Sequence, residues 1–333
     1  MRILSPMPRG SGAIVVHRAL ERQLPGYRVL DYNPWWTLFP PALYAITRGS
    51  ADLIHTAPDY AMFSARRNTP CVITFHGYML DAYMRAYSSP LQWLHYRSDL
   101  RLFTKRALAR ARAVTAVSRF VADLIARDLG FSGNIRVIPN GVDTRLFFPR
   151  HTTVGRSTVR VLFAGNFSRN KGANMLPAVA QQLPDGIEIW CATGLRGKTA
   201  AAIRNNLILL GRIPHADMPA LYNQVDMLLL PTAREGFGLV VAEAMACGLP
   251  IVASNTSTMP ELIHDGRGGL LCTLDDPAGF ASAIARLAAA PALRREMGEY
   301  NRARIEREYT LEQMAQAYKK VFEEALDSRG TRP

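Results

Sequence analysis

The sequence predicts an α/β protein with two doubly wound, parallel-sheet domains. Short runs rich in β-branched and apolar residues alternate with longer segments of helical periodicity along the 333-residue chain. Several of the short runs are apolar at nearly every position, as parallel strands covered on both faces are. Alternation of strand and helix is typical of α/β folds, and a chain of this length normally forms two domains of roughly 100–200 residues each.

Strands are expected in two series separated by a polar stretch around residues 150–157. The first series is Arg2–Ser5, Tyr27–Tyr32, Asp52–Thr56, Cys71–His76, Ala113–Ser118 and Ile135–Pro139. The second is Val159–Ala164, Ile187–Ala192, Leu207–Leu210, Asp226–Pro231, Ile251–Ser254 and Gly269–Cys272. We therefore expect an N-terminal domain over residues 1–150, a C-terminal domain over 151–309 and a final helix over 310–333.

Two helices have clear start signals. Ser89-Pro90-Leu91-Gln92 combines a capping Ser, Pro at the first helical position and Gln at the third, and predicts one helix that continues to about Arg112. Its residues Arg97, Arg101 and Lys105 are spaced four apart and predict a cationic face. Thr310-Leu-Glu-Gln313 is a capping box that predicts the start of the last helix.

The composition excludes several protein classes and the charge suggests a partner. Hydrophobic residues make up 48% and charged residues 20%, which excludes a disordered chain, collagen and a coiled coil. The net charge is +13, and residues 1–150 hold 20 basic against 9 acidic side chains, a net +11. Such a basic half, rich in aromatics, predicts an anionic partner: nucleic acid, a lipid surface or a phosphorylated substrate.

The cysteines and apolar runs indicate a cytoplasmic protein. The four cysteines form no CxxC pair, so neither a metal nor a redox motif is expected. The longest apolar runs, such as Met227–Pro231, have the length of strands, which predicts no membrane-spanning helix. The N-terminal segment lacks the apolar stretch of a secretory signal. We expect a reducing, cytoplasmic location.

The segment Asp226–Ser254 carries the most chemical information. A buried strand is expected to end at Pro231, and a glycine-rich loop containing Glu235 follows it, before a helix that starts near Gly238. The N–H groups and dipole of a helix N-terminus favour phosphate. Glu235 in the loop and Glu243 in the helix are carboxylates that can each accept hydrogen bonds from paired hydroxyls of a sugar or ribose. As an isolated pair they are equally compatible with surface acids beside a structural turn.

Three further loops follow expected strands. Gly165–Gly172 carries the cations Arg169 and Lys171, and Pro8–Gly12 carries Gly10 and Gly12 ahead of a helix. Val15 stands where a dinucleotide fingerprint has its third glycine, which argues against NAD. His76-Gly77 ends another strand, and ligands bind at the carboxyl ends of strands in open α/β sheets.

Several of these stretches, in the same order, resemble the retaining glycosyltransferases of family 4, which have the GT-B fold. Glu235-Gly-Phe-Gly-Leu239 followed by Glu243-Ala-Met-Ala-Cys-Gly-Leu-Pro250 is similar to the family's E-x7-E region. Val137–Asp143 resembles its interdomain segment, Leu210–Asp226 its nucleobase-side region, and Pro260–Gly266 the loop that follows. The resemblance implies two Rossmann-like domains facing a cleft, with the acceptor on the first domain and the nucleotide sugar on the second.

The resemblance also implies roles for individual residues. Glu243 is expected to hold the ribose hydroxyls, and Glu235 the donor sugar. Lys171 matches the family's diphosphate clamp. Arg169 is offered as its second cation, because Asn166 stands where the family commonly has Arg. His76 resembles the N-domain His that contacts the transferred sugar, so Glu235, His76 and Lys171 are the expected catalytic residues. The remaining expected donor contacts come from Gly10, Gly12, Gly236, Phe237, Gly238 and Leu239.

The implied reaction needs neither a metal nor a cofactor. The sequence contains no recognisable nucleophile arrangement and no strong acidic metal cluster. Transfer with retention is proposed for the family to proceed by a front-face step in which the leaving phosphate accepts the proton, so positioning and electrostatics supply the catalysis. The donor is expected to be UDP- or GDP-linked. The acceptor is expected to be a glycan or lipid-linked molecule of bacterial cell-surface polysaccharide, lipopolysaccharide or glycolipid synthesis.

The basic first half is interpreted as the acceptor side. The proline-bracketed aromatic segment Asn33–Tyr44 and the cationic face predict docking on an anionic membrane, at the inner face of the cytoplasmic membrane. A buried aromatic cluster with solvated cations is the alternative. Two other functions stay open: a nucleotide-sugar epimerase of the same fold, and a basic nucleic-acid-binding protein, which the acidic residues of the phosphate loop argue against.

Overall fold

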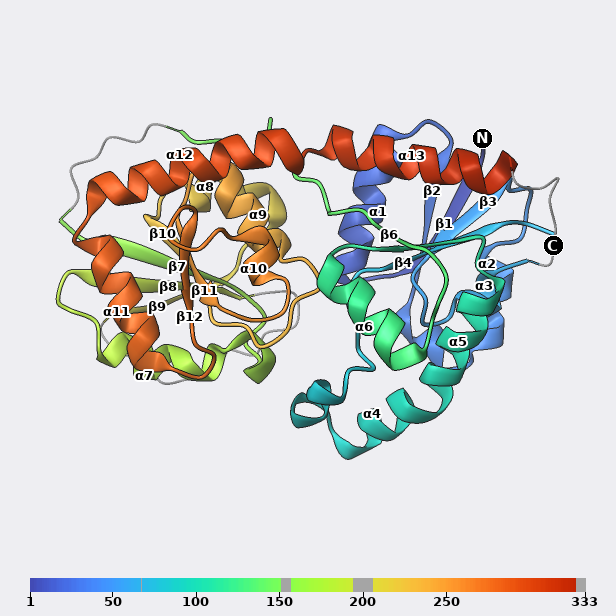
Figure 1. Cartoon of the computed structure of the whole chain (residues 1–333), viewed down its shortest axis with the longest axis horizontal. Coiled ribbons are helices and arrows are strands. Elements are labelled where there is room, and N and C mark those ends of the chain that lie inside the picture. The colour runs from blue at the N-terminus through green and yellow to red at the C-terminus, as the bar shows by residue number, and fades with distance from the viewer. Residues whose placement is uncertain (67, 151–156, 194–205, 328–333) are drawn as a thin grey trace. The chain divides into compact units, whose positions relative to one another are not determined.

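The computed structural model describes residues 1–66, 68–150, 157–193 and 206–327. The described chain forms two compact units. Unit 1 contains Met1–Gly141 together with the segment from Leu311 onward, and unit 2 contains Val142–Thr310. Each unit has one six-stranded sheet with every adjacent pair parallel, and helices cover it (Figure 1). The expected α/β class with two doubly wound sheets is confirmed.

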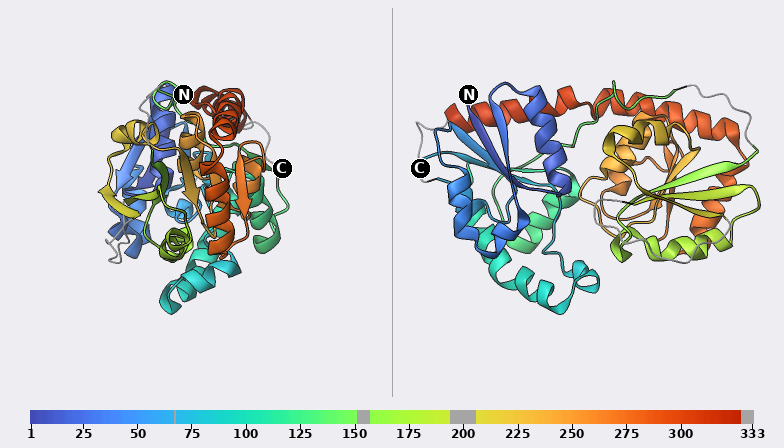
Figure 2. Two further views of the ribbon diagram at one scale, coloured as in Figure 1. Left: turned by 90° about the vertical axis from the view of Figure 1, so that its left-hand side faces the viewer. Right: turned by 180° about the vertical axis from the view of Figure 1, so that it is seen from behind.

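Unit 1 has the strand order β2-β1-β3-β4-β5-β6. Its strands are β1 (Ile3–Pro8), β2 (Tyr27–Tyr32), β3 (Leu53–Thr56), β4 (Cys71–Phe75), β5 (Ala113–Ala116) and β6 (Ile135–Val137). Its helices are α1 (Gly12–Gln23), α2 (Leu43–Ile46), α3 (Ala61–Ser64), α4 (Pro90–His95), α5 (Arg101–Arg110), α6 (Arg119–Leu129) and α13 (Leu311–Asp327). Short 3₁₀ turns cover Pro34–Leu38, Pro40–Ala42 and Ala82–Tyr87. Figures 1 and 2 show α4 projecting from the body of this unit.

Unit 2 has the strand order β12-β11-β10-β7-β8-β9. Its strands are β7 (Val159–Gly165), β8 (Ile187–Thr193), β9 (Leu207–Arg212), β10 (Met227–Leu230), β11 (Ile251–Ser254) and β12 (Gly269–Cys272). Its helices are α7 (Leu176–Gln181), α8 (Met218–Tyr222), α9 (Leu239–Ala246), α10 (Met259–Leu262), α11 (Pro277–Ala288) and α12 (Pro291–Glu308). Short 3₁₀ turns cover Arg169–Lys171, Ala173–Met175 and His215–Asp217.

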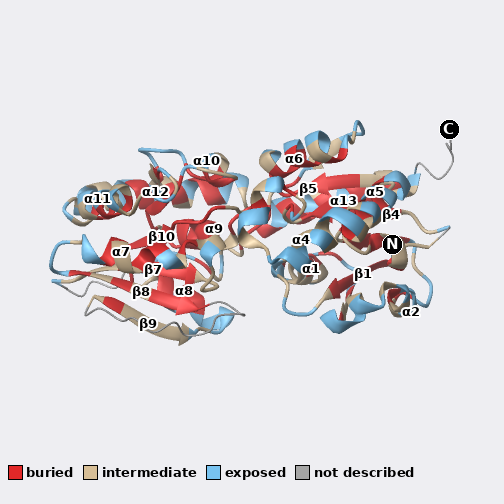
Figure 3. Ribbon diagram, turned by 90° about the horizontal axis from the view of Figure 1, so that it is seen from below, coloured by how far each residue is buried: buried red, intermediate tan, exposed pale blue. Residues whose placement is uncertain are grey.

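The two faces of the unit 1 sheet differ in chemistry. Alternate residues of β3, β4 and β5 pack on α3, α5 and α6 in one apolar core, and Ile54, Ile73 and Val114 belong to it. Because side chains alternate across a strand, the residues between them face α1 and α13. These residues include His55 and the polar Thr74 and Thr115, all fully buried. Figure 3 shows the buried strands of both units.

All twelve expected strands are present, with ends that differ by at most a few residues. The largest extension is β1, predicted to end at Ser5 and found to end at Pro8. Proline lacks the N–H that other residues donate to a neighbouring strand, so it is unfavourable in a strand that is paired on both sides. However, β3 pairs with β1 only at Ile3 and Leu4. Beyond them β1 pairs with β2 alone, and Pro6 and Pro8 therefore fit.

The expected continuous helix from Ser89 to Arg112 is wrong in its middle. The capping box is present, with Ser89 Oγ accepting from the Gln92 amide at 3.2 Å and Gln92 Oε1 from the Ser89 amide at 3.0 Å. A π-helical turn over Tyr96–Leu100 then separates α4 from α5. The π turn shifts the register of the helix, and the Arg101 guanidinium donates to Asp128 O at 2.6 Å. The predicted cationic face is therefore not continuous.

The expected domain boundary at residue 150 lies instead after Gly141. Packing within unit 2 explains this difference: the Phe147 ring lies 5.5 Å from the ring of His215 and 6.0 Å from that of Tyr222. The Arg302 guanidinium also donates to Phe147 O at 2.7 Å. The polar stretch that suggested the later boundary lies at 151–156, outside the described residues. The last helix, α13, is grouped with unit 1, where it packs on α1.

Within the described ranges, no helix is both long and apolar enough to span a membrane.

Candidate active site

The candidate donor residues of unit 2 gather where its sheet changes direction. From β7 the chain proceeds outward through β8 and β9, and then returns to place β10 on the other side of β7. Ligands of open α/β sheets bind at such a switch point, outside the carboxyl ends of the strands. The loop with Arg169 and Lys171 follows β7, and the loop with Glu235 follows β10. These loops belong to adjacent strands, so the fold brings residues about sixty positions apart in the sequence together.

The two loops are joined by a charged pair and a hydrogen-bonded backbone. Lys171 Nζ contacts Glu235 Oε1, and both side chains are largely shielded, with exposures of 25% and 11%. The carbonyl of Asn170 accepts from the Ala233 amide at 2.9 Å and from Thr232 Oγ1 at 3.1 Å. The Glu235 amide donates to Ser257 Oγ at 3.2 Å. The lysine and the carboxylate are therefore held by the backbone of both loops.

Glycines allow this close approach. Gly172 has φ +72°, and a Cβ at this position would lie 2.1 Å from the carbonyl oxygen of Pro231. Gly238 has φ +92° and forms the N-cap of α9, where a Cβ would lie 2.8 Å from the terminal methyl of Met259. Positive φ values favour glycine, because other residues then bring Cβ too close to the backbone. The turn from Gly236 to Leu239 thus directs the N-terminus of α9 toward the switch point.

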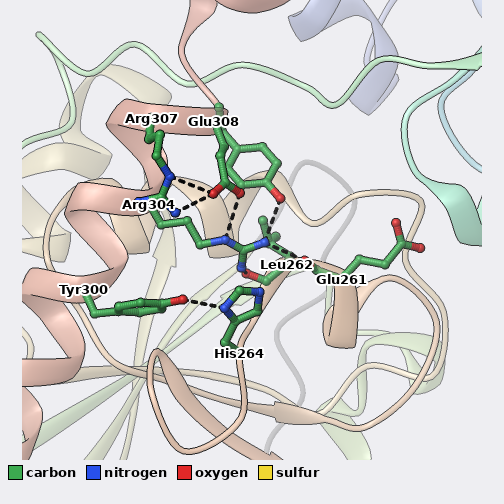
Figure 4. Close-up of polar contacts among 8 residues, drawn as sticks. Glu261, Leu262, His264, Tyr300, Arg304, Arg307 and Glu308 are labelled. Carbon is green, nitrogen blue, oxygen red and sulfur yellow. Dashed lines mark hydrogen bonds and ion pairs between the residues drawn. The ribbon is translucent and has the colours of Figure 1, made fainter.

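A buried arginine holds the segment that packs behind this turn. Arg304 of α12 donates to Leu262 O at 2.6 Å, to Glu261 O at 2.9 Å and to Glu308 Oε2 at 3.0 Å (Figure 4). These bonds satisfy carbonyls at the end of α10, the helix that begins with Met259. Figure 4 also shows the contact of His264, two residues beyond α10, with Tyr300 of α12.

Glu243 lies in α9 and is buried, with a 9% exposed side chain. The Tyr222 hydroxyl donates to Glu243 Oε2 at 3.0 Å, and His215 Nε2 lies 3.0 Å from Oε1. Burial, reinforced by the negative charge of Glu243, raises the pKa of Tyr222 well above its usual value, so its hydroxyl stays a donor. Each carboxylate oxygen keeps further acceptor capacity for a ligand.

The candidate residues of unit 1 lie at the carboxyl ends of its strands. Gly10 lies in the connection from β1 to α1, and Gly12 is the first residue of α1, which Ser11 caps by accepting from the Ile14 amide at 3.3 Å. His76 follows β4 directly, and its Nε2 lies 2.9 Å from Nε2 of His17 in α1. Helix α1 therefore connects the glycine loop to His76.

A small pocket of about 50 Å³ opens at the switch point of this sheet, between the ends of β1 and β3. Its lining includes Tyr32, Asp59 and Tyr60. Burial raises the pKa of the Asp59 carboxyl to about 6, and the nearby His95 opposes that shift. This pocket was not predicted from the sequence, because Asp59 follows no recognisable motif.

Two family models match the chain, and they cover both units. The model described as Glycosyltransferase Family 4 matches residues 2–146, and the model described as Glycosyl transferases group 1 matches residues 158–290. The chain belongs to the family 4 glycosyltransferases. The expected family is thus confirmed, and the matched stretches include the loops with His76, Lys171 and Glu235.

Two curated relatives are moderately similar to this chain. A D-inositol 3-phosphate glycosyltransferase of Corynebacterium jeikeium is 30% identical over 231 residues, which cover 61% of this chain and 55% of that protein. An N-acetyl-alpha-D-glucosaminyl L-malate synthase of Bacillus anthracis is 27% identical over 237 residues, covering 66% of this chain and 61% of that protein. The chain thus aligns with little more than half of these relatives.

Solved structures agree over nearly the whole chain. Sucrose-phosphate synthase from Thermosynechococcus elongatus superposes with a TM-score of 0.85 at 21% identity, covering 98% of this chain and 100% of that one. The Anabaena protein HepE, solved in complex with UDP-glucose, superposes with a TM-score of 0.79 at 19% identity, covering 97% and 99%. These likenesses establish the GT-B fold class that the motifs implied.

Sequence reasoning missed the partners of two candidate residues of this family member. His215 lies near Glu243, and His17 lies near His76. His17 belongs to no motif quoted above, and His215 lies within the expected nucleobase-side region but had no expected role. Tyr222 lies within the expected nucleobase-side region, but its bond to Glu243 was not expected. Among the described residues, no group of three or more His, Cys, Asp or Glu side chains is arranged to hold a metal ion.

Lowering the pH from 7.5 to 5.5 is expected to reduce the free energy of unfolding of unit 1 by about 3 kcal/mol. Burial lowers the pKa of His17 and of His55 well below 6.5 in the folded protein, and that of His76 to about 4. Below about pH 6.5 the unfolded chain therefore binds more protons than the folded one, so stability falls as the pH falls. Asp59, with its raised pKa, offsets less than about 1 kcal/mol of this loss.

Hydrogen exchange, corrected for the intrinsic rate at each pH, measures the opening free energy of each unit separately. Unit 2 is the internal reference and is expected to lose less stability, because its described histidines, His215 and His264, are exposed and only partial burial lowers the pKa of His264. An opening free energy of unit 1 that stays constant or rises between pH 7.5 and 5.5 would contradict the prediction.

Proposed function

We propose that this protein transfers a sugar from a nucleoside-diphosphate sugar to a hydroxyl of a glycan or lipid-linked acceptor, with retention of anomeric configuration. The observation that carries the proposal is the pair of Lys171 and Glu235 at the switch point of unit 2, beside the glycine turn that opens α9. Family membership supports the reaction class, and HepE, whose structures contain UDP or UDP-glucose, supports a UDP-linked donor. A GDP-linked donor is the alternative within this proposal.

In this proposal, different residues of unit 2 contact the ribose, the sugar and the diphosphate of the donor. Glu243, oriented by Tyr222 and His215, accepts the two ribose hydroxyls with its remaining lone pairs. Glu235 accepts hydroxyls of the donor sugar. Lys171, helped by Arg169, and the backbone amides from Gly236 to Leu239 face the diphosphate.

The proposed chemistry needs no base from the protein. As the glycosidic bond breaks, negative charge grows on the leaving diphosphate, and Lys171 stabilises that charge in a site shielded from water. The leaving phosphate accepts the proton of the acceptor hydroxyl. In unit 1, His76 contacts the transferred sugar, and Gly10 and Gly12 keep the end of β1 clear of side chains. No metal or cofactor takes part in this scheme.

Glu243→Ala is expected to weaken binding of the nucleotide sugar by roughly ten- to a hundredfold, because hydrogen bonds to a charged group contribute about 1.5–3 kcal/mol. The donor is first identified by thermal shift with UDP-, GDP- and ADP-sugars, since a bound ligand stabilises the folded state. Calorimetry with that donor then compares Glu243→Ala with Glu296→Ala, an exposed acid of α12.

Unchanged affinity in Glu243→Ala would overturn the donor site. Glu243→Gln, which keeps one acceptor and the packing, separates loss of binding from misfolding. Incubation of donor without acceptor separates the two enzyme functions, because an epimerase would release a new nucleotide sugar and a transferase would not.

The acceptor side includes an exposed aromatic segment. Trp35, Leu38 and Phe39 are 75%, 76% and 69% exposed, and Leu91 and Leu94 of α4 are 77% and 63% exposed. The alternative in which these aromatics form a buried cluster is therefore wrong. Aromatic and aliphatic side chains on a basic unit favour the interface of an anionic membrane. We include peripheral binding at the cytoplasmic membrane, in bacterial cell-surface polysaccharide or glycolipid synthesis, in the proposed function.

At low ionic strength the protein is expected to float with vesicles that contain anionic lipid, and Trp35→Ser with Phe39→Ser is expected to reduce the bound fraction several-fold. Uncharged vesicles and added salt are the controls, since attraction to anionic headgroups is screened by salt. Absence of lipid association at low ionic strength would contradict membrane docking and leave the donor site unaffected.

A further inference from the structure

A chain of hydrogen bonds crosses the buried layer between the sheet of unit 1 and its helices α1 and α13. It starts at Thr115 of β5, whose Oγ1 lies 2.6 Å from Thr74 Oγ1, and continues 2.7 Å from Thr74 Oγ1 to His55 Nε2. His55 Nδ1 lies 2.7 Å from the Tyr27 hydroxyl, which lies 2.7 Å from His17 Nδ1. The chain ends at His76, a residue of the proposed site.

The three histidines of this hydrogen-bonded series, His17, His55 and His76, are neutral at neutral pH. Burial, with the neighbouring histidines, lowers the pKa of His17 and His55 far below the usual value. Burial also lowers the pKa of His76 to about 4. A neutral imidazole has one N–H donor and one bare acceptor nitrogen. If one ring nitrogen accepts a hydrogen bond, the other nitrogen must carry the hydrogen and act as donor. The donor of one hydrogen bond therefore determines the donor of the next one along the series.

In the contact between Thr74 and Thr115 either hydroxyl could donate, so we assign the direction from the second contact of Thr115, with the carbonyl of Ile73. The Thr115 hydroxyl donates to this carbonyl at 3.3 Å, and a hydroxyl has only one hydrogen. Thr115 Oγ1 is thus an acceptor toward Thr74, and the Thr74 hydroxyl donates to it. Thr74 Oγ1 must then accept from His55, so His55 carries its hydrogen on Nε2 and has a bare Nδ1.

The remaining links follow in turn. The Tyr27 hydroxyl donates to the bare Nδ1 of His55 and accepts from His17 Nδ1–H, a hydrogen that Ser5 Oγ shares at 2.7 Å. His17 Nε2 is bare, and His76 Nε2–H donates to it. His76 Nδ1 is therefore bare, and this buried atom accepts no hydrogen bond from any described residue.

We propose that this hydrogen-bond chain holds His76 in its Nε2–H tautomer and so presents Nδ1 as an acceptor for a hydroxyl of bound substrate. His17, His55 and Thr115 are positioning residues that act through His76. The opposite tautomer would present an N–H donor at the same place and leave a substrate hydroxyl without an acceptor for its hydrogen. The identity of that hydroxyl as one from a sugar rests on the proposed function, whereas the tautomer does not.

Long-range ¹H–¹⁵N correlation spectra of the full chain, labelled with ¹⁵N-histidine at pH 7.5, test the tautomer directly. His76→Gln identifies the His76 signals by their loss. We expect an unprotonated Nδ1 and a protonated Nε2 on His76. A protonated Nδ1 would overturn the proposal, and because no substrate is present, failure of sugar transfer does not affect the result.

A matched pair of variants tests the coupling to Thr115, which lies on β5, one strand beyond the β4 end that carries His76. Thr115→Val keeps the shape but removes the hydroxyl, so Thr74 can donate toward His55 instead, and both directions become available. We expect both tautomers of His76 in Thr115→Val and the wild-type tautomer in Thr115→Ser. An unchanged His76 spectrum in a folded Thr115→Val would overturn the coupling, since packing alone does not select a tautomer.

Discussion

Replacement of Lys171 by alanine is expected to slow cleavage of the nucleotide sugar by about a thousandfold, close to 4 kcal/mol. The ammonium group lies in a shielded site next to Glu235, at the switch point where the proposed diphosphate is held. A cation there stabilises the charge that develops on the leaving group more than it stabilises the bound donor. The rate is therefore expected to change more than the donor affinity.

The measurement is the release of nucleoside diphosphate, with water as acceptor, from the nucleotide sugar that gives the largest thermal shift. Arg169→Ala is the matched control, because Arg169 is a more exposed cation of the same loop, and we expect less than a tenfold effect from it. Glu235→Gln alone and combined with Lys171→Ala forms a double-mutant cycle, in which contacting residues should give non-additive effects. A Lys171→Ala rate above a tenth of wild type would contradict the proposed role.

The fold could be predicted from the sequence because many of its strands are continuous apolar runs. Strands such as Leu228–Leu230 are buried on both faces, so their apolar runs stand out from the amphipathic segments between them. The donor loops could be predicted for a related reason. Glu235 and Glu243 lie close together in the sequence, in a glycine-rich stretch whose spacing is itself the signal.

The rest depends on contacts between distant residues. Thr115 reaches His76 through residues of three different strands and one helix, and each of them alone resembles an ordinary core position. The π turn at Tyr96–Leu100 adjoins a bond from Arg101 to a carbonyl of α6, which no helical periodicity encodes. Single-residue patterns identify what a segment is, but the partner that orients a side chain is determined only by packing.

Gly172→Ala is expected to destabilise unit 2 by about 3–5 kcal/mol, through backbone strain at a positive φ and a forced shift of a neighbouring strand end. The new Cβ would lie 2.1 Å from the carbonyl oxygen of Pro231, a backbone atom that has no rotamer to adopt. The shift would also separate Asn170 from Ala233 and Thr232, the bonds that hold Lys171 against Glu235. Donor affinity should therefore fall together with stability.

Gly211→Ala separates the two causes. Gly211 lies in β9 of the same unit and has φ +73°, but a Cβ there would meet no atom within 4 Å, so only the backbone strain of about 1 kcal/mol applies. Hydrogen exchange of peptides from unit 2 measures both variants, and peptides from unit 1 serve as the reference. Equal losses in the two variants would mean that φ alone requires glycine at residue 172. A much larger loss in Gly172→Ala would mean that the close approach of the loops after β7 and β10 depends on the missing side chain, and that this glycine sets the distance between Lys171 and Glu235.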